Sequence, residues 1–310
     1  MANFLTSAVL SGLAAGITLG AFAQGCGDKK RGHFTPAPPS ADLNVPADQQ
    51  SQNTLPRSML DRPDDYHGAQ FHLTYALPLD GADSYYDVNG HMTRSADYIQ
   101  DWLSACTGKE LRIDTHQGRY DITFVRVPIL RNDQSLLSAA IVNTLDVAIA
   151  GAGLNDPHKK YIIYYDGPNN YAYGAAYLDG RVATIHLRAG NQPLCSENIG
   201  GDHLGVLHEA FHSLGAVNPL APHYDFGRPG HTTEPGDLMN KISSDLQVDP
   251  GNDDYFGHGR TDIPDLKNSA YLRPSTRSQT QSAQRTQKHK HTSRFGSRQQ
   301  RHIAHRAGRR

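Results

Sequence analysis

The chain contains little cysteine, little glutamate and only one long apolar run, and each shortage narrows the classes of protein to consider. Its 310 residues include three cysteines and four glutamates. Three cysteines allow one disulfide. Cys106 and Cys195 are the candidate pair, because both fall in the expected folded domain, and Cys26 is left over. No segment after residue 23 is apolar over the length that spans a bilayer, so only the N-terminus could anchor the chain in a membrane.

Acidic residues are absent from the last 38 residues, which carry eleven Lys or Arg among Gln, Ser, Thr and His. The rest of the chain has 19 basic and 31 acidic residues, a net charge of −12. Residues 273–310 are therefore predicted to form a disordered basic tail that is attracted to an anionic cell-wall polymer or surface. Its only aromatic residue is Phe295, which argues against specific recognition of nucleic acid.

The apolar run occupies residues 1–23 and ends in Ala21-Phe22-Ala23, the pattern of a signal-peptide cleavage site. This pattern predicts a secreted, extracellular or cell-surface protein. No Lys or Arg precedes the run, so an uncleaved membrane anchor is the alternative. Residues 24–65 hold six prolines among polar residues, which predicts a linker or a short pro-segment.

The most informative stretch is H-E-x-x-H at residues 208–212, followed by Gly215. On a helix, His208 and His212 lie one turn apart on one face, where two imidazoles can bind one zinc ion. Glu209 lies about 100° further round the helix, where it can act as a general base on a water molecule. Because Glu is scarce, this pattern is expected by chance only roughly 0.01 times in the chain. Gly215 is predicted to end the helix.

Residues 208–215, followed by the Asp-Leu-Met-Asn sequence at 237–240, resemble the metzincin-like zinc peptidases, and in particular a group of secreted bacterial zincins. The resemblance implies a zinc peptidase with a methionine turn at Met239 beneath the metal. The usual third ligand of that family falls at Asn218 here, and Asn is a poor zinc ligand. Gly230-His231, just before the expected methionine turn, resembles that bacterial group, so the resemblance makes His231 the preferred third ligand, with His223 as the alternative.

Apolar periodicity between residues 66 and 272 predicts one α+β domain. The resemblance implies that this domain is a zincin-like catalytic domain with a twisted mixed sheet and two long helices. The expected strands lie at residues 71–77, 111–113, 122–127, 161–165, 173–178 and 182–187, and the expected helices begin near residue 93 and span 134–150, 202–214 and 263–272.

A second metal site is suggested by three carboxylates downstream of the expected methionine turn. Asp249, Asp253 and Asp254 lie within six residues of one another. Oxygen ligands suit Ca²⁺, so these side chains could hold a calcium ion. No complete calcium-loop motif is present, and a solvated turn rich in Asp and Asn is the alternative.

The predicted function is that of a secreted zinc-dependent endopeptidase, a monomer that hydrolyses protein or peptide substrates with Glu209 as the general base. Two alternatives stay open. One is a secreted surface-binding protein with a structural zinc site and an attachment tail. The other is a hydrolase of non-peptide substrates on the same zinc scaffold. Structural zinc sites are closed and catalytic ones keep an open position, so the coordination sphere would separate the first alternative from an enzyme.

Overall fold

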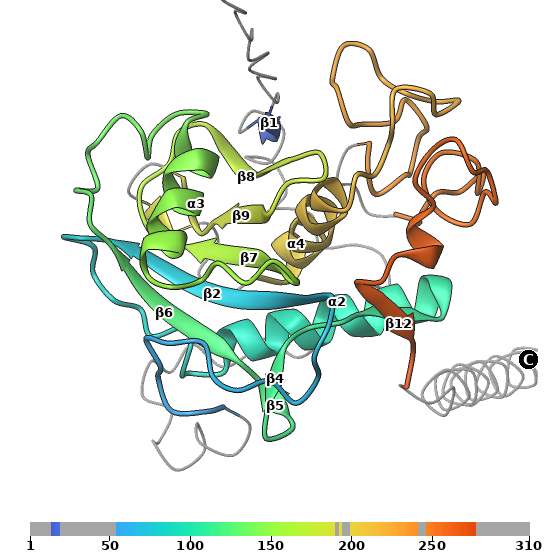
Figure 1. Ribbon diagram of the computed structural model, residues 1–310. Helices are drawn as coiled ribbons and strands as arrows, with labels where there is room; N and C mark the ends of the chain where they lie inside the picture. The colour runs from blue at the N-terminus through green and yellow to red at the C-terminus, as the bar shows by residue number, and fades with distance from the viewer. Residues whose placement is uncertain (1–13, 19–53, 190–191, 194–198, 241–245, 277–310) are drawn as a thin grey trace, which may run out of the picture. The chain divides into compact units, whose positions relative to one another are not determined.

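The structure is a computed structural model that describes residues 14–18, 54–189, 192–193, 199–240 and 246–276. The chain divides into two units, residues 1–273 and 274–310, and the fold and sites below belong to the first. A mixed sheet runs through this unit in the order β1-β8-β9-β7-β2-β6 (Figure 1). Its strands are β1 (Ala14–Thr18), β2 (Gln70–Pro78), β6 (Ile122–Val127), β7 (Lys159–Tyr165), β8 (Ala172–Tyr177) and β9 (Val182–His186).

The central strands are parallel, and β8 is the exception. β2 pairs in parallel with both β6 and β7, and β7 pairs in parallel with β9. β8 runs antiparallel to β9 on one side and to β1 on the other. Without β1, the sheet has five strands and β8 lies at its edge.

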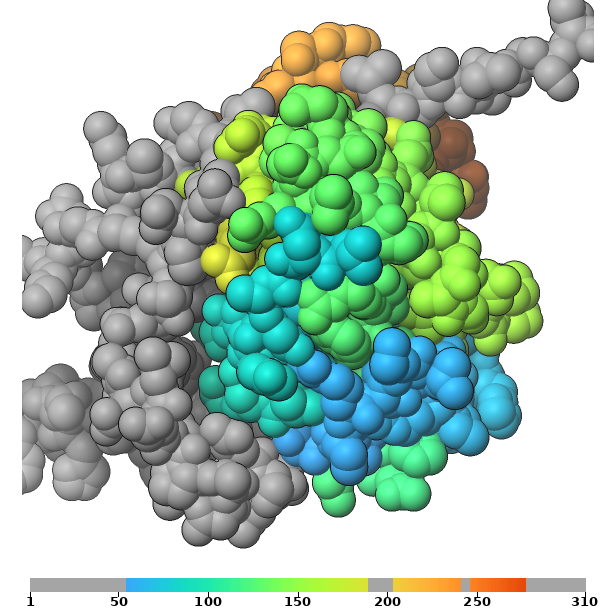
Figure 2. All heavy atoms as spheres, turned by 90° about the vertical axis from the view of Figure 1, so that its left-hand side faces the viewer, coloured from blue at the N-terminus to red at the C-terminus, as the bar shows by residue number. Residues whose placement is uncertain are grey.

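Helices cover both faces of the sheet, which is why its central strands are apolar on both sides. The chain leaves β2 through α2 (His91–Thr107) to reach β6, and then returns across β2 through α3 (Ile141–Gly151) to reach β7. Two right-handed crossovers in opposite directions place their helices on opposite faces. α4 (Ile199–Ser213) packs on the α2 side. Figure 2 shows the green α3 region covering one side of the molecule.

The alternation of β7 divides the core into two clusters. Tyr161, Ile163 and Tyr165 pack with α3, whereas Ile162 and Tyr164 pack with α2 and α4. α2 contributes a buried stripe at the spacing of helical turns. That stripe consists of Met92, Ala96, Ile99 and Leu103.

The other secondary structure of the described residues consists of strands of two or three residues and one 3-10 helix. Three two-stranded sheets pair β4 with β5, β10 with β11, and β12 with β3. These elements are β3 (Lys109–Leu111), β4 (Thr115–His116), β5 (Arg119–Tyr120), β10 (Arg188–Ala189), β11 (Gln192–Pro193), the 3-10 helix η2 (Leu266–Asn268) and β12 (Leu272–Pro274). None of the described helices is long and apolar enough to cross a membrane.

Two expected helices were wrong in extent. The helix predicted at 134–150 begins only at Ile141, because the Asp133 carboxylate accepts from the Ser135 amide and closes a local turn instead. The closing helix predicted at 263–272 is a single 3-10 turn, η2, followed by β12. There the Asp265 side chain accepts from the Lys267 amide and caps the turn, but the segment turns extended at Ser269.

Residues 54–65, which belong to the predicted linker, contact the domain through charged groups. The Lys159 ammonium lies 2.8 Å from both carboxylate oxygens of Asp61 and 2.6 Å from an oxygen of Asp64. Arg62 forms an ion pair with buried Asp121. Apolar content alone concealed this attachment, because ion pairs form much of it.

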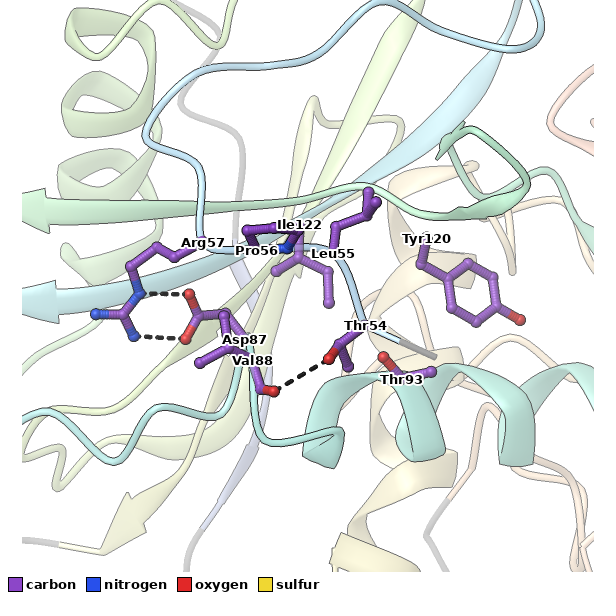
Figure 3. Close-up of a pocket in the computed structure, with 9 residues that line it drawn as sticks. All are labelled: Thr54, Leu55, Pro56, Arg57, Asp87, Val88, Thr93, Tyr120 and Ile122. Atoms are coloured by element: carbon purple, nitrogen blue, oxygen red, sulfur yellow. Dashed lines mark hydrogen bonds and ion pairs between the residues drawn. The ribbon is translucent and has the colours of Figure 1, made fainter. Parts of the chain in front are cut away.

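A pocket in the same region does not belong to the histidine site. It is lined by residues 54–57, by the loop before α2, by Thr93 on α2, by Tyr120 of β5 and by the start of β6 (Figure 3). Arg57 donates from two nitrogens to the Asp87 carboxylate, both at 2.6 Å, and the Thr54 hydroxyl donates to the Val88 carbonyl at 3.2 Å. No residue predicted to bind metal or to act in catalysis lines this pocket.

Several predicted features fall partly or wholly outside the described residues. The predicted signal peptide contributes only β1, and the predicted linker contributes only residues 54–65. Residues 277–310 of the predicted tail lie outside, as do Cys26 and Cys195. Cys106 lies near the end of α2, and the predicted Cys106–Cys195 disulfide stays a prediction because its second residue lies outside the described residues.

Candidate metal centre

The site is built on α4, whose apolar side is held in the core by Leu207 and Phe211, both fully buried. Packing of these side chains fixes the rotation of the helix, so that His208 and His212 share its other side one turn apart. The helix ends as the sequence predicts. Gly215 adopts a φ of 83°, and its amide donates to the His212 carbonyl at 2.8 Å, while the Ala216 amide donates to the Phe211 carbonyl at 3.0 Å.

A third histidine reaches these two from the loop after α4. The Nε2 atom of His208 lies 3.0 Å from Nε2 of His212 and 3.3 Å from Nε2 of His231. All three side chains are buried, and their ligand atoms lie within 4.8 Å of one another. The structure therefore brings together the two helix histidines and the preferred third candidate.

The spacing of these nitrogens fits a zinc ion. A tetrahedral ion with Zn–N bonds of about 2.0–2.1 Å holds its nitrogen ligands roughly 3.3–3.4 Å apart. His208 Nε2 carries a lone pair, because its Nδ1 donates to the Leu238 carbonyl. His212 also has a buried Nδ1 with no hydrogen-bond partner. The donor set thus matches what zinc requires.

Burial keeps the three imidazoles in the neutral form that binds metals. It lowers the pKa of His208 to about 3, with the neighbouring His231 and Arg228 lowering it further. Burial also lowers the pKa of His212 well below its usual value and lowers that of His231. His208 Nδ1 lies 2.7 Å from the Leu238 carbonyl, to which it can only donate, so Nε2 is the nitrogen left for a metal.

Glu209 lies beside the histidines with a carboxylate that nothing else uses. The side chain is fully buried, and neither oxygen has a hydrogen-bond partner. Burial alone raises its pKa well above the usual value. A carboxylate in this state is a stronger base than one in water, which is the property that proton transfer near neutral pH requires.

Gly174 on β8 makes room for Glu209, and sequence analysis missed this residue. A Cβ atom at position 174 would lie 2.7 Å from Cγ of Glu209 and 2.9 Å from its Oε1, closer than real contacts allow. The strand therefore passes directly over the glutamate only because no side chain intervenes. No local sequence signal marks this glycine, because the approach is made between distant elements.

The segment of the predicted methionine turn contacts His208 through its backbone. Met239 is fully buried in the same core cluster as α4. Its carbonyl accepts from the Thr232 amide at 3.1 Å, and its amide donates to the Asp237 carboxylate. Because the adjacent Leu238 carbonyl accepts from His208, the turn fixes the direction of a ligand as well as the shape of the loop.

Two other ligand candidates lie elsewhere. His223 Nδ1 is 3.1 Å from a carboxylate oxygen of Asp254, and it is not part of the histidine triad. Asn218, at the family's usual ligand position, is a turn residue whose side chain accepts from the Leu220 amide.

The predicted calcium set of three aspartates is not assembled as one group. Asp249 forms a group with Glu234 and Asp237, whereas Asp253 and Asp254 converge with His223 and Glu234. Asp249 instead accepts from the backbone amides of residues 253–256, which turns its carboxylate into the centre of the loop. Sequence proximity was misleading because a tight turn points successive carboxylates in different directions.

No family model and no curated protein matches this chain. Among solved structures, the chain is similar to archaemetzincin from Methanopyrus kandleri. The two are 14% identical, the match covers 56% of this chain and 83% of that chain, and the TM-score is 0.33. A likeness this weak establishes neither family nor activity.

Proposed function

We propose that this protein is a zinc-dependent endopeptidase in which His208, His212 and His231 hold the ion and Glu209 is the general base. The observation that carries the proposal is the convergence of three Nε2 atoms, with separations of 3.0 and 3.3 Å, two of them on a helix that also carries the buried and unpartnered carboxylate of Glu209. A structural site needs no such carboxylate, whereas hydrolysis does.

Zinc, when bound, supplies Lewis-acid polarisation of a carbonyl and makes water more acidic. The remaining chemistry falls to the protein. Glu209 accepts the proton that water releases as it attacks the peptide carbonyl, and then delivers it to the leaving amine nitrogen. The same carboxylate must therefore take up a proton and release it again. Protein or peptide substrates are therefore proposed.

The decisive variant is Glu209→Gln, which removes proton transfer without removing a ligand. We expect zinc content, measured by mass spectrometry, to be unchanged, and turnover of a fluorogenic peptide or casein to fall by about 10²–10⁴-fold. Glu110→Gln is the matched control, because Glu110 is also buried but pairs with Arg273. Activity near that of the parent in Glu209→Gln would remove Glu209 from the mechanism.

The ligand assignment is tested by comparing His231→Ala with His223→Ala. Loss of one of three protein ligands should lower zinc affinity at least tenfold to a hundredfold in the first variant. The second should retain zinc, because His223 interacts with Asp254 instead. Zinc retention by His231→Ala together with loss in His223→Ala would transfer the ligand role to His223.

One observation favours a structural zinc site as the second candidate. His208, Glu209 and His212 are fully buried and His231 is 4% exposed, as in closed structural sites. In that case the protein would be a surface-binding protein. Removal of zinc by a chelator would then unfold the protein. The parent and Glu209→Gln would both lack peptidase activity, so the substitution would change no turnover.

Secretion also belongs to the proposal and rests on residues 1–23. Cleavage after Ala23 would remove β1 from the sheet and leave β8 at its edge. Expression of the full chain with a C-terminal tag, followed by N-terminal sequencing of the exported protein, tests the cleavage. A mature protein that begins at Gln24 is the expected result, and retention of Met1 in the cell membrane would indicate an anchor.

A further inference from the structure

A group of three carboxylates lies behind the methionine turn. Glu234, Asp237 and Asp249 each offer an oxygen within 4.8 Å of the others. Asp237 is fully buried and Asp249 is 1% exposed, so these charges are largely removed from water. The loops that carry them are joined directly, because the Leu238 amide donates to the Gln247 carbonyl at 2.9 Å.

Two oxygens in this group have no partner although they are buried. Asp237 uses Oδ1 to accept from the Met239 amide and, at 3.0 Å, from the Tyr255 hydroxyl. Its Oδ2 accepts nothing, and neither does Oε2 of Glu234. A buried acceptor without a partner costs about 1–3 kcal/mol, and more when it is charged. The two unpartnered oxygens belong to carboxylates of one group, in which a shared positive partner would offset this cost.

A second acidic group in the same fold shows how this chain otherwise solves the problem. Asp61 and Asp114 also converge in the interior, but the Lys159 ammonium lies 2.8 and 2.7 Å from their oxygens. Among the described residues, no salt bridge reaches Glu234, Asp237 or Asp249. The comparison shows that the group behind the methionine turn lacks the cation that the other group has.

The protonation behaviour agrees with this lack. Burial raises the pKa of Asp237 to about 7, and the neighbouring Asp249 and Glu234 raise it further, against hydrogen bonds from Met239 and Tyr255 that lower it. Burial also raises the pKa of Glu234, to which Asp249, Asp253 and Asp254 add, whereas His223 lowers it. Glu234 and Asp237 therefore resist carrying their charges together.

We propose that Glu234, Asp237 and Asp249 bind one Ca²⁺ ion behind the methionine turn. All donors are oxygens, which excludes the nitrogen and sulfur ligands that Zn²⁺ prefers. Ca²⁺ accepts carboxylates in irregular geometry, whereas Mg²⁺ demands a near-ideal octahedron and keeps several waters. The proposal concerns a site separate from the histidines and does not depend on the proposed peptidase activity.

The site would act on the turn that Asp237 closes. Its Oδ1 accepts from the Met239 amide, and the intervening Leu238 carbonyl accepts from His208. An ion on Oδ2 would hold the same carboxylate from its other side and so restrict the turn. Calcium binding is accordingly expected to raise the melting temperature of the zinc-loaded protein.

The experiment uses the full zinc-loaded chain at pH 8, where Asp237 is largely ionised, after removal of free calcium. Calorimetric titration with CaCl₂ should show one ion per chain, and the melting temperature should rise with calcium until the site is saturated. MgCl₂ at equal concentration should have a much smaller effect. No heat and no change in melting temperature at millimolar calcium would overturn the proposal, and so would an equal response to magnesium.

Variants locate the site. Asp237→Asn and Glu234→Gln should each weaken calcium binding at least tenfold with zinc content unchanged. Asp253→Asn is the matched control: it is half-exposed, belongs to the set predicted from sequence and should bind calcium as the parent does. If Asp237→Asn does not fold, Glu234→Gln decides alone. Calcium binding that survives Glu234→Gln, or that is lost in Asp253→Asn, contradicts the assignment.

Discussion

Gly174 and Glu209 show how a site can depend on a residue that has no functional group. Glu209 lies against β8 at Gly174, where the strand has no side chain. A Cβ atom at Gly174 would lie only 2.7 Å from Cγ of Glu209. The backbone of β8 thus limits where the carboxylate can go. This makes Gly174 a positioning residue for the proposed base, acting by its absence of bulk.

Gly174→Ala is therefore expected to displace Glu209 and to lower kcat by about 10- to 100-fold, since small displacements of a reacting group have effects of this size. Zinc content should not change, because no histidine is touched. Gly205→Ala is the control, since a Cβ atom at Gly205 meets nothing within 4 Å. It lies within α4 and should leave kcat unchanged while stabilising the helix by up to about 1 kcal/mol. Unaltered kcat in Gly174→Ala would contradict the positioning role.

Burial of His186 is expected to contribute to the loss of stability at low pH. It is fully buried, and burial lowers its pKa to about 4, against the Ala172 carbonyl that raises it. The unfolded chain therefore binds more protons than the folded one between pH 6.5 and 4, so stability falls as pH drops through that window. His186→Gln should lose roughly 1 kcal/mol less than the parent between pH 7.5 and 5.5, as measured by urea unfolding. Equal losses in the two proteins would show that His186 does not titrate as described.

The local part of the metal centre was predictable at the scale of single residues, and the nonlocal part was not. His208 and His212 follow from helical spacing, which the sequence displays directly. His231 comes from a loop, and only the resemblance of the Gly-His just before the methionine turn favoured it over His223. The role of Gly174 could not be predicted either, because Gly174 lies on β8 and its partner Glu209 lies on α4.

At the scale of elements, two glycines with positive φ have different roles: one lies at the end of α4 and the other in the loop after it. Gly215 ends the helix with a φ of 83°, and nothing lies closer than 3.8 Å to a Cβ atom placed there. Gly230 also has a φ of 83°, but its Cβ atom would lie 3.2 Å from Nδ1 and Cε1 of His212. The first glycine serves the backbone alone, and the second also leaves space for a proposed ligand.

Alanine at either position should lower stability by about 1–2 kcal/mol, the cost of a left-handed conformation for an L-residue. Only Gly230→Ala should also weaken zinc affinity, because it crowds His212. Chemical unfolding and competitive zinc titration of both variants check the two effects separately. Equal zinc affinity in both would mean that His212 adjusts freely.

Element boundaries were predicted less well than element types. The strands from β6 to β9 and the helix α4 appear where apolar periodicity places them, because elements buried on one or both faces have a strong apolar pattern. The start of α3 was misplaced because Asp133 closes a turn that periodicity does not record. The ion pairs that attach residues 54–65 were missed, since polar residues read as linker when their partners are remote.

At the scale of the molecule, we expect attachment and hydrolysis to be separable. Residues 277–310 carry ten basic residues and no acidic ones, and the rest of the chain has a net charge of −11. Truncation after residue 276 should leave turnover of a soluble peptide unchanged but abolish retention on an anionic polymer at low salt. Retention of the full chain should fall steeply as salt increases, because each contact releases counterions. Loss of turnover on truncation would place the tail in the enzyme itself.

The pairing of β1 with β8 has a consequence for how the sheet edge is shared. Ala14, Ala15 and Gly16 lie opposite Tyr177, Ala176 and Ala175, on the strand that passes over Glu209 at Gly174. Any extended peptide that seeks the same backbone groups of β8 competes with a strand tethered to the same chain. Such a tether presents its strand at a fixed effective concentration, which dilution of the protein does not lower. A cut between residues 18 and 54 would release β1 from its tether. A peptide would then pair with the β8 edge more readily, even if its own affinity were unchanged.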